Sequence, residues 1–167
     1  MLQVRSDHYI LKTFALNSFY AFGVGLSYNS GMGTFITGQK SDATFRLWEV
    51  PVDIGLGIEI PLYTWIKLVG VAGPSVMMLA QNRSDYGNGE KGKNKYQVSY
   101  GQFASAQFKI NLATFSDNLA YELFTSSQVA RLSLNFDVRY ENYKNFEDAL
   151  LAISGTSIGA GFTFEFL

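Results

Sequence analysis

The sequence predicts an all-β protein, an antiparallel up-and-down β-barrel of about eight strands, of which about seven are visible in these 167 residues. Two observations lead to this prediction. Large apolar residues alternate with small or polar ones over long stretches, which is the period of a strand with two different faces. These stretches are separated by connections that are short on one side and long and polar on the other. The length is that of a single domain, spanning 1–167.

Seven segments follow the alternating pattern. In chain order they are 9–16, 20–28, 44–60, 65–81, 96–110, 130–140 and 157–166. The clearest are 44–60, 130–140 and 157–166, where one face is continuously apolar and the other is small or charged. The segment 65–81 is apolar on both faces, and 9–16 is the weakest candidate. Most of these segments exceed the roughly 5–6 residues of a typical strand in a globular sheet.

The connections differ in length between the two ends of the predicted sheet. We expect short ones at 17–18 and 61–64, and longer polar ones at 37–42, 82–95 and 142–147. The segment 116–127 lies on the short-turn side but is too long for a turn. It opens with Ser-Asp-Asn, residues that are typical of a helix N-terminus, so we expect a short helix there.

Composition excludes several classes of protein and of site. The absence of cysteine excludes a disulfide scaffold, a thiolate metal site and a cysteine nucleophile. The single histidine, His8, leaves no second one for a two-histidine zinc site, and we expect neither a metal nor a cofactor. A formal net charge of -1 argues against binding to nucleic acid. No stretch reaches the roughly 20 apolar residues of a membrane-spanning helix.

The polar face of the strands decides whether such a barrel is soluble or spans a membrane. A face that meets water usually carries long charged side chains, whereas this one is dominated by Gly, Ser, Asn and Thr, which suit a crowded, narrow interior. Aromatic residues gather toward the strand ends as two girdles, the pattern that membrane interfaces favour. They are Tyr28, Trp48, Tyr96, Tyr100, Tyr140 and Tyr143 near the long connections, and Tyr20, Phe162, Phe164 and Phe166 near the short ones. We therefore predict a transmembrane barrel whose apolar face contacts lipid.

The last strand resembles the C-terminal β-signal of bacterial outer-membrane proteins. In that signal a polar residue and a glycine precede alternating hydrophobic residues that end on an aromatic one; the matching residues are Ser157, Gly159, Phe162, Phe164 and Phe166. Leu167 departs from it, because the usual last residue is Phe. The pair of segments 49–51 and 72–75, each with a proline, is similar to small outer-membrane β-barrel domains of the OmpA-type and PorT-like kind. The resemblance implies a bacterial outer-membrane location, and assembly-machinery contact through the last strand.

Strand parity adds an expectation about the N-terminal end. Single-chain bacterial barrels have an even number of strands and short periplasmic turns. If the C-terminus is periplasmic, the long connections lie on the outer side of the membrane. The seven recognised strands are then one short of an even number. We expect that a signal peptide and a first strand precede this numbering, or that the first strand lies unrecognised near residues 2–4.

Charged residues of the polar face are expected to form a polar network in the lumen, in two layers. The periplasmic layer contains Glu59, Lys67, Lys109, Arg131 and Glu165, and the outer layer contains Glu49, Asp53, Asp137, Arg139 and Glu141. Opposite charges at a similar depth predict ion pairs, since unpaired charges in a crowded interior are costly. The alternative interpretation is a narrow polar pathway or a proton relay.

These observations predict a non-enzymatic outer-membrane barrel with a structural, anchoring or accessory-subunit role in the cell envelope. The alternatives are a narrow pore, a soluble lipocalin-like binder of an apolar ligand, and a membrane hydrolase that uses His8 as its base. The expected partners are membrane lipids, lipopolysaccharide phosphates contacted by basic residues of 82–95, and a protein of an envelope complex. Apolar residues of the 116–127 segment are the candidate contact with that protein: Leu119, Tyr121, Leu123 and Phe124.

Overall fold

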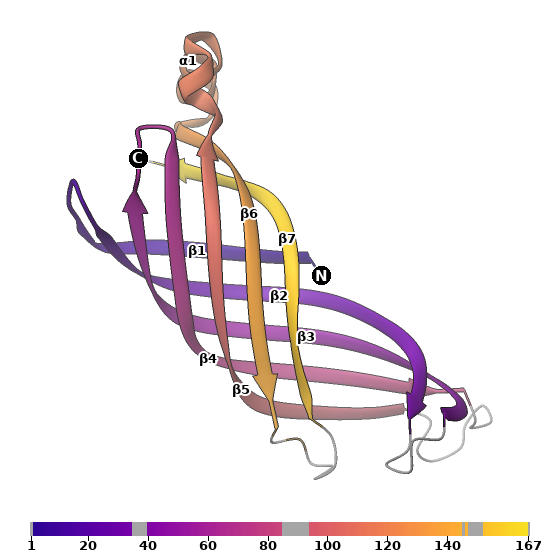
Figure 1. Ribbon diagram of the computed structural model, residues 1–167. Helices are drawn as coiled ribbons and strands as arrows, with labels where there is room; N and C mark the ends of the chain where they lie inside the picture. The colour runs from indigo at the N-terminus through magenta and orange to yellow at the C-terminus, as the bar shows by residue number, and fades with distance from the viewer. Residues whose placement is uncertain (1, 35–39, 85–93, 145, 147–151, 167) are drawn as a thin grey trace.

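The computed structural model describes residues 2–34, 40–84, 94–144, 146 and 152–166 and arranges them as one antiparallel sheet (Figure 1). Seven strands follow one another in chain order across the sheet. They are β1 (Leu2–Lys12), β2 (Asn17–Thr34), β3 (Lys40–Pro61), β4 (Ile66–Arg83), β5 (Asn94–Asn111), β6 (Val129–Tyr143) and β7 (Ile153–Phe166). A 3₁₀ turn, η1 (Leu112–Phe115), and one helix, α1 (Asp117–Ser127), connect β5 to β6. The predicted all-β, up-and-down arrangement of seven strands is confirmed.

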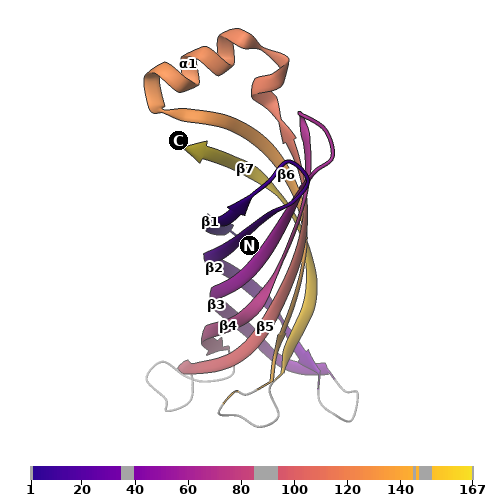
Figure 2. The same ribbon diagram turned by 90° about the vertical axis from the view of Figure 1, so that its left-hand side faces the viewer.

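The sheet curls into a deep trough but does not close (Figure 2). Each strand pairs only with its neighbours in the chain, so within the described residues β1 and β7 are edge strands with no ladder between them. Because an even number of antiparallel steps separates β1 from β7, these two edges run in the same direction. The expected closed barrel of about eight strands is therefore not what the structure contains. It contains seven strands of an open, strongly curved wall.

The N-terminal strand differs from the sequence expectation in both of its bounds. Residues 2–4 belong to the same strand as Tyr9, and the turn falls at 13–16. The strand expected at 9–16 is therefore correct only for 9–12, and the turn expected at 17–18 is wrong, because these residues begin β2. Local hydrogen bonds position this turn: the Thr13 backbone N–H donates to Asn17 Oδ1 (3.0 Å), and the Leu16 N–H donates to Thr13 Oγ1 (3.0 Å). Side chains of this kind commonly stabilise turns.

The remaining boundaries follow the expectation more closely. Strand β3 begins at Lys40, inside the connection expected at 37–42, and the β3–β4 turn at 62–65 includes Trp65, which was expected in a strand. The short helix expected in 116–127 is present as α1. It ends at Ser127, and the next residue, Gln128, has a φ of 56°, in the left-handed region. No helix in the part of the chain that the structure describes is long and apolar enough to span a membrane.

The outer, convex face of the sheet is apolar on every strand. Large side chains on this face are between about a third and nearly fully exposed; examples from successive strands are Val4, Phe22, Leu56, Leu68, Val98, Phe136 and Phe162. The inner face buries the residues that alternate with them. The outer face is thus largely apolar, and the inner face carries both apolar and charged side chains.

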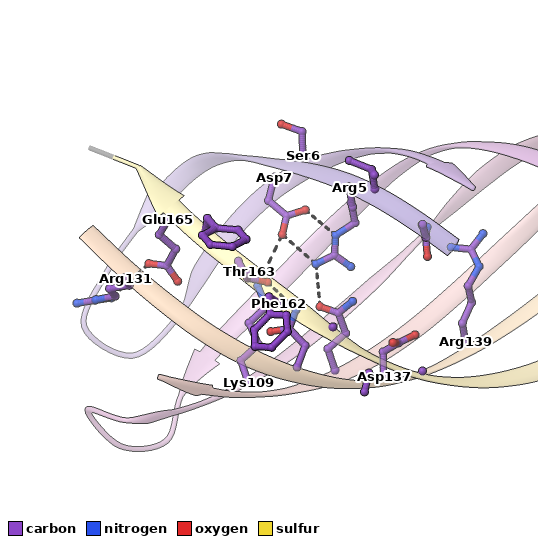
Figure 3. Close-up of a pocket in the computed structure, with 18 of the residues that line it drawn as sticks. Arg5, Ser6, Asp7, Lys109, Arg131, Asp137, Arg139, Phe162, Thr163 and Glu165 are labelled. Atoms are coloured by element: carbon purple, nitrogen blue, oxygen red, sulfur yellow. Dashed lines mark hydrogen bonds and ion pairs between the residues drawn. The ribbon is translucent and has the colours of Figure 1, made fainter. Parts of the chain in front are cut away.

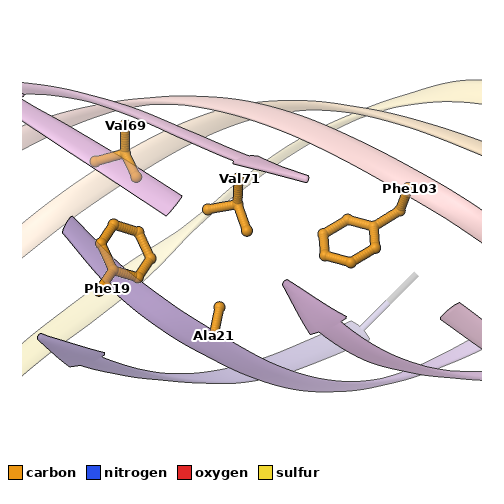
Figure 4. Packing of buried hydrophobic residues seen from close by; sticks show 5 residues of the cluster. All are labelled: Phe19, Ala21, Val69, Val71 and Phe103. Atoms are coloured by element: carbon orange, nitrogen blue, oxygen red, sulfur yellow. The ribbon is translucent and has the colours of Figure 1, made fainter. Parts of the chain in front are cut away.

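Two apolar clusters fill part of the interior. One consists of Phe19, Ala21, Val69, Val71 and Phe103, with Tyr9 packed against it (Figure 4). The other, nearer the long connections, consists of Met77, Leu79, Tyr143 and Phe146. Gly57 makes room for the first cluster, because a Cβ at this position would overlap the Phe19 ring.

Candidate functional site

Charged side chains fill the rest of the interior, and the first group centres on Glu59. This residue on β3 is fully buried (0% exposed). Its carboxylate accepts hydrogen bonds from Tyr9 Oη (2.9 Å) and Asn17 Nδ2 (3.0 Å), and Lys67 Nζ lies 3.1 Å away. The Nζ atom of Lys109 completes the shell at 3.9 Å. Donors from β1, β2, β4 and β5 therefore neutralise one carboxylate, as a buried charge requires.

The Glu59 cluster extends to both edge strands. Toward β7, Lys67 Nζ contacts Glu165 Oε1 at 2.6 Å, and Arg131 lies 3.5 Å from the other Glu165 oxygen. Toward β1, Lys109 Nζ lies 3.8 Å from Asp7 Oδ2. The Lys67–Glu165 and Lys109–Asp7 pairs join strands that share no ladder, so ion pairs across the interior connect β7 to β4 and β1 to β5.

Arg5 strengthens the connection from β1. Its guanidinium binds Asp7 through two hydrogen bonds (2.7 and 2.9 Å) and donates a third to Gln107 Oε1 on β5 (2.9 Å). Figure 3 shows Arg5 and Asp7 pointing from β1 into the cavity, while Ser6 points away from it. The bidentate pair with Asp7, on the same strand, fixes the orientation of the guanidinium, and the hydrogen bond to Gln107 connects β1 to β5 across the interior.

The second charged group centres on Asp53. Its two oxygens each lie 2.9 Å from Arg139 Nη2, and they also accept from Gln3 Nε2 (3.0 Å) and Ser75 Oγ (2.6 Å). Arg139 also pairs with Glu141, and its guanidinium lies 4.5 Å from the centre of the Phe103 ring. The Ser75 hydroxyl is shared with the Tyr143 hydroxyl at 2.6 Å. The Asp53 cluster thus connects β1, β4 and β6 to β3.

The structure places the ten charged residues expected in the lumen in three different situations. Eight belong to the two clusters: Glu59, Lys67, Lys109, Arg131, Glu165, Asp53, Arg139 and Glu141. Glu49 lies apart from them and accepts from Ser27 Oγ (2.6 Å) and Asn29 Nδ2 (3.2 Å). Asp137 has no hydrogen bond or ion pair within the described residues, and its carboxylate lies directly above Gly159 of β7.

Sequence reasoning missed the residues that β1 contributes to both clusters. Gln3, Arg5, Asp7 and Tyr9 all point inward. The alternation of apolar and polar residues in this segment could have revealed them, because the apolar Leu2, Val4 and Ile10 lie on the exposed face and the residues between them therefore point inward. The alternation was hard to recognise because two of the outward positions, Ser6 and His8, are polar rather than apolar.

A cavity of 1020 Å³ separates the two edge strands. It is lined by residues 3–9 of β1, residues 157–166 of β7, and inward side chains of β5 and β6. Asn135 lies in its wall, and the Oδ1 atom of this residue is buried with no hydrogen-bond partner among the described residues. We call this opening, between β1 and β7, the seam.

The residues that resemble a C-terminal β-signal all lie in β7. Phe162, Phe164 and Phe166 point outward and are more than half exposed. Ser157 and Gly159 pair with Arg139 and Asp137 of β6. This strand therefore presents an aromatic outer face and one free backbone edge.

Helix α1 stands clear of the sheet at the end where the short turns lie (Figures 1 and 2). Of the four residues expected to contact a partner, Tyr121 and Phe124 are exposed (71% and 49%) and Leu123 is half-buried. The side chain of Leu119 lies outside the described part of the structure. The basic connection expected to contact lipopolysaccharide also lies mostly outside it, at residues 85–93.

Aromatic side chains contact one another at both ends of the curved sheet. At the short-turn end Trp65 packs against Tyr63 (ring centroids 6.3 Å apart) and Phe115 (5.9 Å). At the other end Tyr28 packs against Trp48 at 4.8 Å.

His8 is exposed on the outer face, stacks on Tyr20 at 5.0 Å and has Nε2 3.1 Å from Ser6 Oγ. Among the described residues no carboxylate pairs with its other ring nitrogen, so the third group of a nucleophile–base–orienter set is missing. The same part of the chain contains no group of three His, Asp or Glu side chains placed to hold a metal ion.

Comparison of this chain with protein families, with curated proteins and with solved structures finds no match.

Proposed function

We propose that this chain is an integral membrane β-protein of the bacterial outer membrane, with a structural or anchoring role. The observation that supports this proposal most strongly is the inversion of polarity. Most charged side chains of the inner face pair with one another inside the trough, while every strand presents large apolar side chains outward.

The outer face argues for lipid as its surroundings. Soluble monomers rarely expose contiguous apolar patches larger than a few hundred Å². Here such side chains cover the outside of all seven strands. A soluble lipocalin-like barrel requires the reverse arrangement, with an apolar interior that holds the ligand, whereas this interior buries Glu59, Lys109, Asp53 and Arg139.

Strand length and aromatic placement support the same proposal. A tilted transmembrane strand needs about 9–11 residues, and the shortest strand here, β1, has 11. Aromatic pairs lie at both ends of the apolar surface, where interfacial girdles are expected. The outer-membrane location rests on these features and on the resemblance of β7 to a C-terminal β-signal.

The interior favours an anchor over a pore. Ion pairs cross it from β4 to β7 and from β6 to β3, and the Phe19 and Tyr143 clusters fill the space beside them. We therefore expect no discrete single-channel conductance in planar bilayers.

We assign a role as accessory subunit of an envelope complex to α1, whose Tyr121 and Phe124 are exposed at the short-turn end. In the proposed orientation this helix is periplasmic and contacts a protein of the envelope. The double variant Tyr121→Ser/Phe124→Ser should fold into membranes normally and lose that co-purifying protein, and retention of the protein would remove the role.

The membrane proposal is tested with the 167-residue chain refolded into detergent micelles and into liposomes. We expect heat-modifiable migration on detergent gels, and sedimentation with the liposomes. In the variant Leu56→Arg a charge is placed on the exposed outer face of β3, and we expect a loss of about 2–4 kcal/mol in folding free energy in liposomes. The control Thr64→Arg lies in a turn and should cost less than about 1 kcal/mol. A chain that stays monomeric in water without detergent, and tolerates Leu56→Arg there, would refute the proposal.

A further inference from the structure

The outer face of β2–β5 changes its chemistry over three consecutive rows of residues near the long connections. Residues paired across neighbouring strands lie side by side, so the strand register defines each row. An aliphatic row contains Val50, Met78 and Val98. The next two positions outward along each strand form an aromatic row, Tyr28, Trp48, Ala80 and Tyr96, and then a polar row, Ser30, Arg46, Asn82 and Asn94. A membrane leaflet presents the same order, from hydrocarbon through the interface to the headgroups.

Arg46 is the first charged residue on the outer face of β3 in this direction. From Trp48 to Ile60 the outward residues of the strand are all apolar. Arg46 is exposed and has no hydrogen bond or ion pair with any described residue. The other members of the polar row are uncharged, so none of them neutralises the guanidinium. An arginine at this level can therefore bind an anionic oxygen of a headgroup, and phosphate suits its planar fork of donors.

Neutral donors lie on both sides of Arg46 in the polar row. Asn82 is its neighbour on β4, and Asn82 Nδ2 donates to Asn94 Oδ1 (2.7 Å). This bond leaves Nδ2 of Asn94 without an acceptor among the described residues. On the β2 side the hydroxyl of Ser30 likewise has no partner in the described part of the chain. The polar row thus combines one cation with uncharged donors, a set that can satisfy several oxygens of one phosphate.

Ala80 interrupts the aromatic row directly below Arg46 and Asn82. Its neighbours in the row are Trp48 and Tyr96, which are two strand spacings, or about 10 Å, apart. Tyr28 packs against Trp48 from the β2 side (ring centroids 4.8 Å apart). The methyl group of Ala80 therefore leaves a gap between two large exposed rings. A lipid with its chains in the hydrocarbon can pass through this gap and bring its headgroup to the polar row.

The basic residues nearest to this surface belong to the other face of the sheet. Arg83 and Lys95 alternate with Asn82 and Asn94 along their strands, and the Arg83 guanidinium lies 5.2 Å from the centre of the Phe45 ring. The outer-face site therefore does not use these two residues of the 82–95 segment, in which the sequence predicts contacts with lipopolysaccharide.

We propose that Arg46, Asn82 and Asn94, with the gap at Ala80, bind the phosphate headgroup of one anionic membrane lipid. The guanidinium pairs with the phosphate, the amide of Asn94 donates to it, and the rings of Trp48 and Tyr96 flank the lipid below the headgroup. This inference rests on the proposed membrane function and adds the class of lipid that the outer face selects.

The test measures lipid contact at Trp48 in phosphatidylcholine vesicles. The chain has two tryptophans, so Trp65→Phe leaves Trp48 as the only one. Lipids with dibrominated chains quench a tryptophan that they contact, and the dependence of quenching on their mole fraction gives a relative binding constant. We expect brominated phosphatidylglycerol to bind about fivefold more tightly than brominated phosphatidylcholine, as one interfacial cation predicts.

Two variants with matched controls, all in the Trp65→Phe background, test the headgroup contact and the gap separately. Arg46→Gln should abolish the preference, whereas Lys95→Gln removes the same charge from the opposite face and should keep it. Ala80→Leu fills the gap and should remove most of the preference. Its control Ala72→Leu enlarges another outward alanine of β4, deeper in the hydrocarbon, and should not change it.

Competition distinguishes a membrane lipid from a free anion. Unlabelled lipid A, which carries phosphate groups, should displace the brominated phosphatidylglycerol and restore Trp48 fluorescence. Inorganic phosphate at matched ionic strength should leave the quenching unchanged.

Three results would overturn the inference: a preference that survives Arg46→Gln, an equal loss in Lys95→Gln, and displacement of the lipid by inorganic phosphate. Failure of the membrane proposal is read separately, from sedimentation with liposomes. A chain that does not sediment with them refutes the membrane function. A chain that sediments normally but shows no preference at Trp48 refutes the lipid site alone.

Discussion

The Glu59 and Asp53 clusters neutralise a buried carboxylate in different ways. Glu59 is surrounded by two lysines and two neutral donors, and its network reaches both edge strands through Asp7 and Glu165. Asp53 relies on one arginine and two neutral donors, and its network reaches β1 but not β7. The difference indicates that the Glu59 cluster determines the curvature of the seam, while the Asp53 cluster mainly fixes β6 against β3.

The largest expected effect comes from removing the centre of the first cluster. In Glu59→Ala the buried amines of Lys67 and Lys109 lose their shared carboxylate, and we expect a loss of about 3–5 kcal/mol in urea unfolding from liposomes. Hydrogen exchange should rise in both β1 and β7. The control Glu122→Ala, on the exposed surface of α1, should change neither quantity. Protection retained in β7 would contradict the role assigned to this cluster.

Removing the cation of the second cluster should have a smaller and more local effect. Arg139→Met leaves Asp53 with its bonds from Gln3 and Ser75, so we expect a loss of about 2–3 kcal/mol. Exchange should rise in β6 and in the adjoining part of β3, with β1 protected. The double variant with Glu59→Ala should be additive within about 0.5 kcal/mol if the clusters act independently. Strong coupling would show that they form one network.

A third comparison concerns the apolar packing between the two clusters. Gly57→Ala places a methyl group where the Phe19 ring lies, and repacking this buried ring should cost about 1–2 kcal/mol. Gly31→Ala meets nothing within 4 Å and should be nearly neutral. Unfolding of both variants in liposomes measures the difference. Equal effects would show that the interior is looser than the structure indicates.

The smallest expected effect lies outside both clusters, at the end of α1. Gln128 has a left-handed φ of 56°, so Gln128→Gly should stabilise the helix end by about 1 kcal/mol. Ser126→Gly, inside the helix, should destabilise it by a similar amount. Circular dichroism on thermal unfolding separates the two. A destabilised Gln128→Gly would mean that the side chain itself holds the helix end.

The sequence was most informative where apolar and small residues alternate without interruption. In β3, from Trp48 to Ile60, this alternation predicts both the strand and the face that each side chain takes, and the helix in 116–127 follows from its capping residues. The turn at 13–16 was missed because hydrogen bonds between Thr13, Leu16 and Asn17 determine it, and these leave no periodic signal.

The sequence could not predict which inner-face side chains contact each other, and the reason is different. Alternation places Asp53 and Arg139 on the inner face, but their contact depends on the register and curvature of the strands between β3 and β6. The same holds for Lys67 and Glu165. The contribution of β1 was hidden by Ser6 and His8 at outward positions.

The unequal lengths of the strands have a mechanical consequence. Strand β3 has 22 residues, or about 73 Å at roughly 3.3 Å per residue, whereas a bilayer core about 30 Å thick crossed at a tilt near 45° takes only about 42 Å. In the proposed membrane about 30 Å of β3 therefore stands outside the lipid. Ladders β2–β3 and β4–β5 continue to Thr34↔Lys40 and Asn82↔Asn94, beyond the ends of β6 and β7 (Figure 1). We expect this four-stranded extension to be stiff, so that it holds its far end at a fixed distance from the membrane surface.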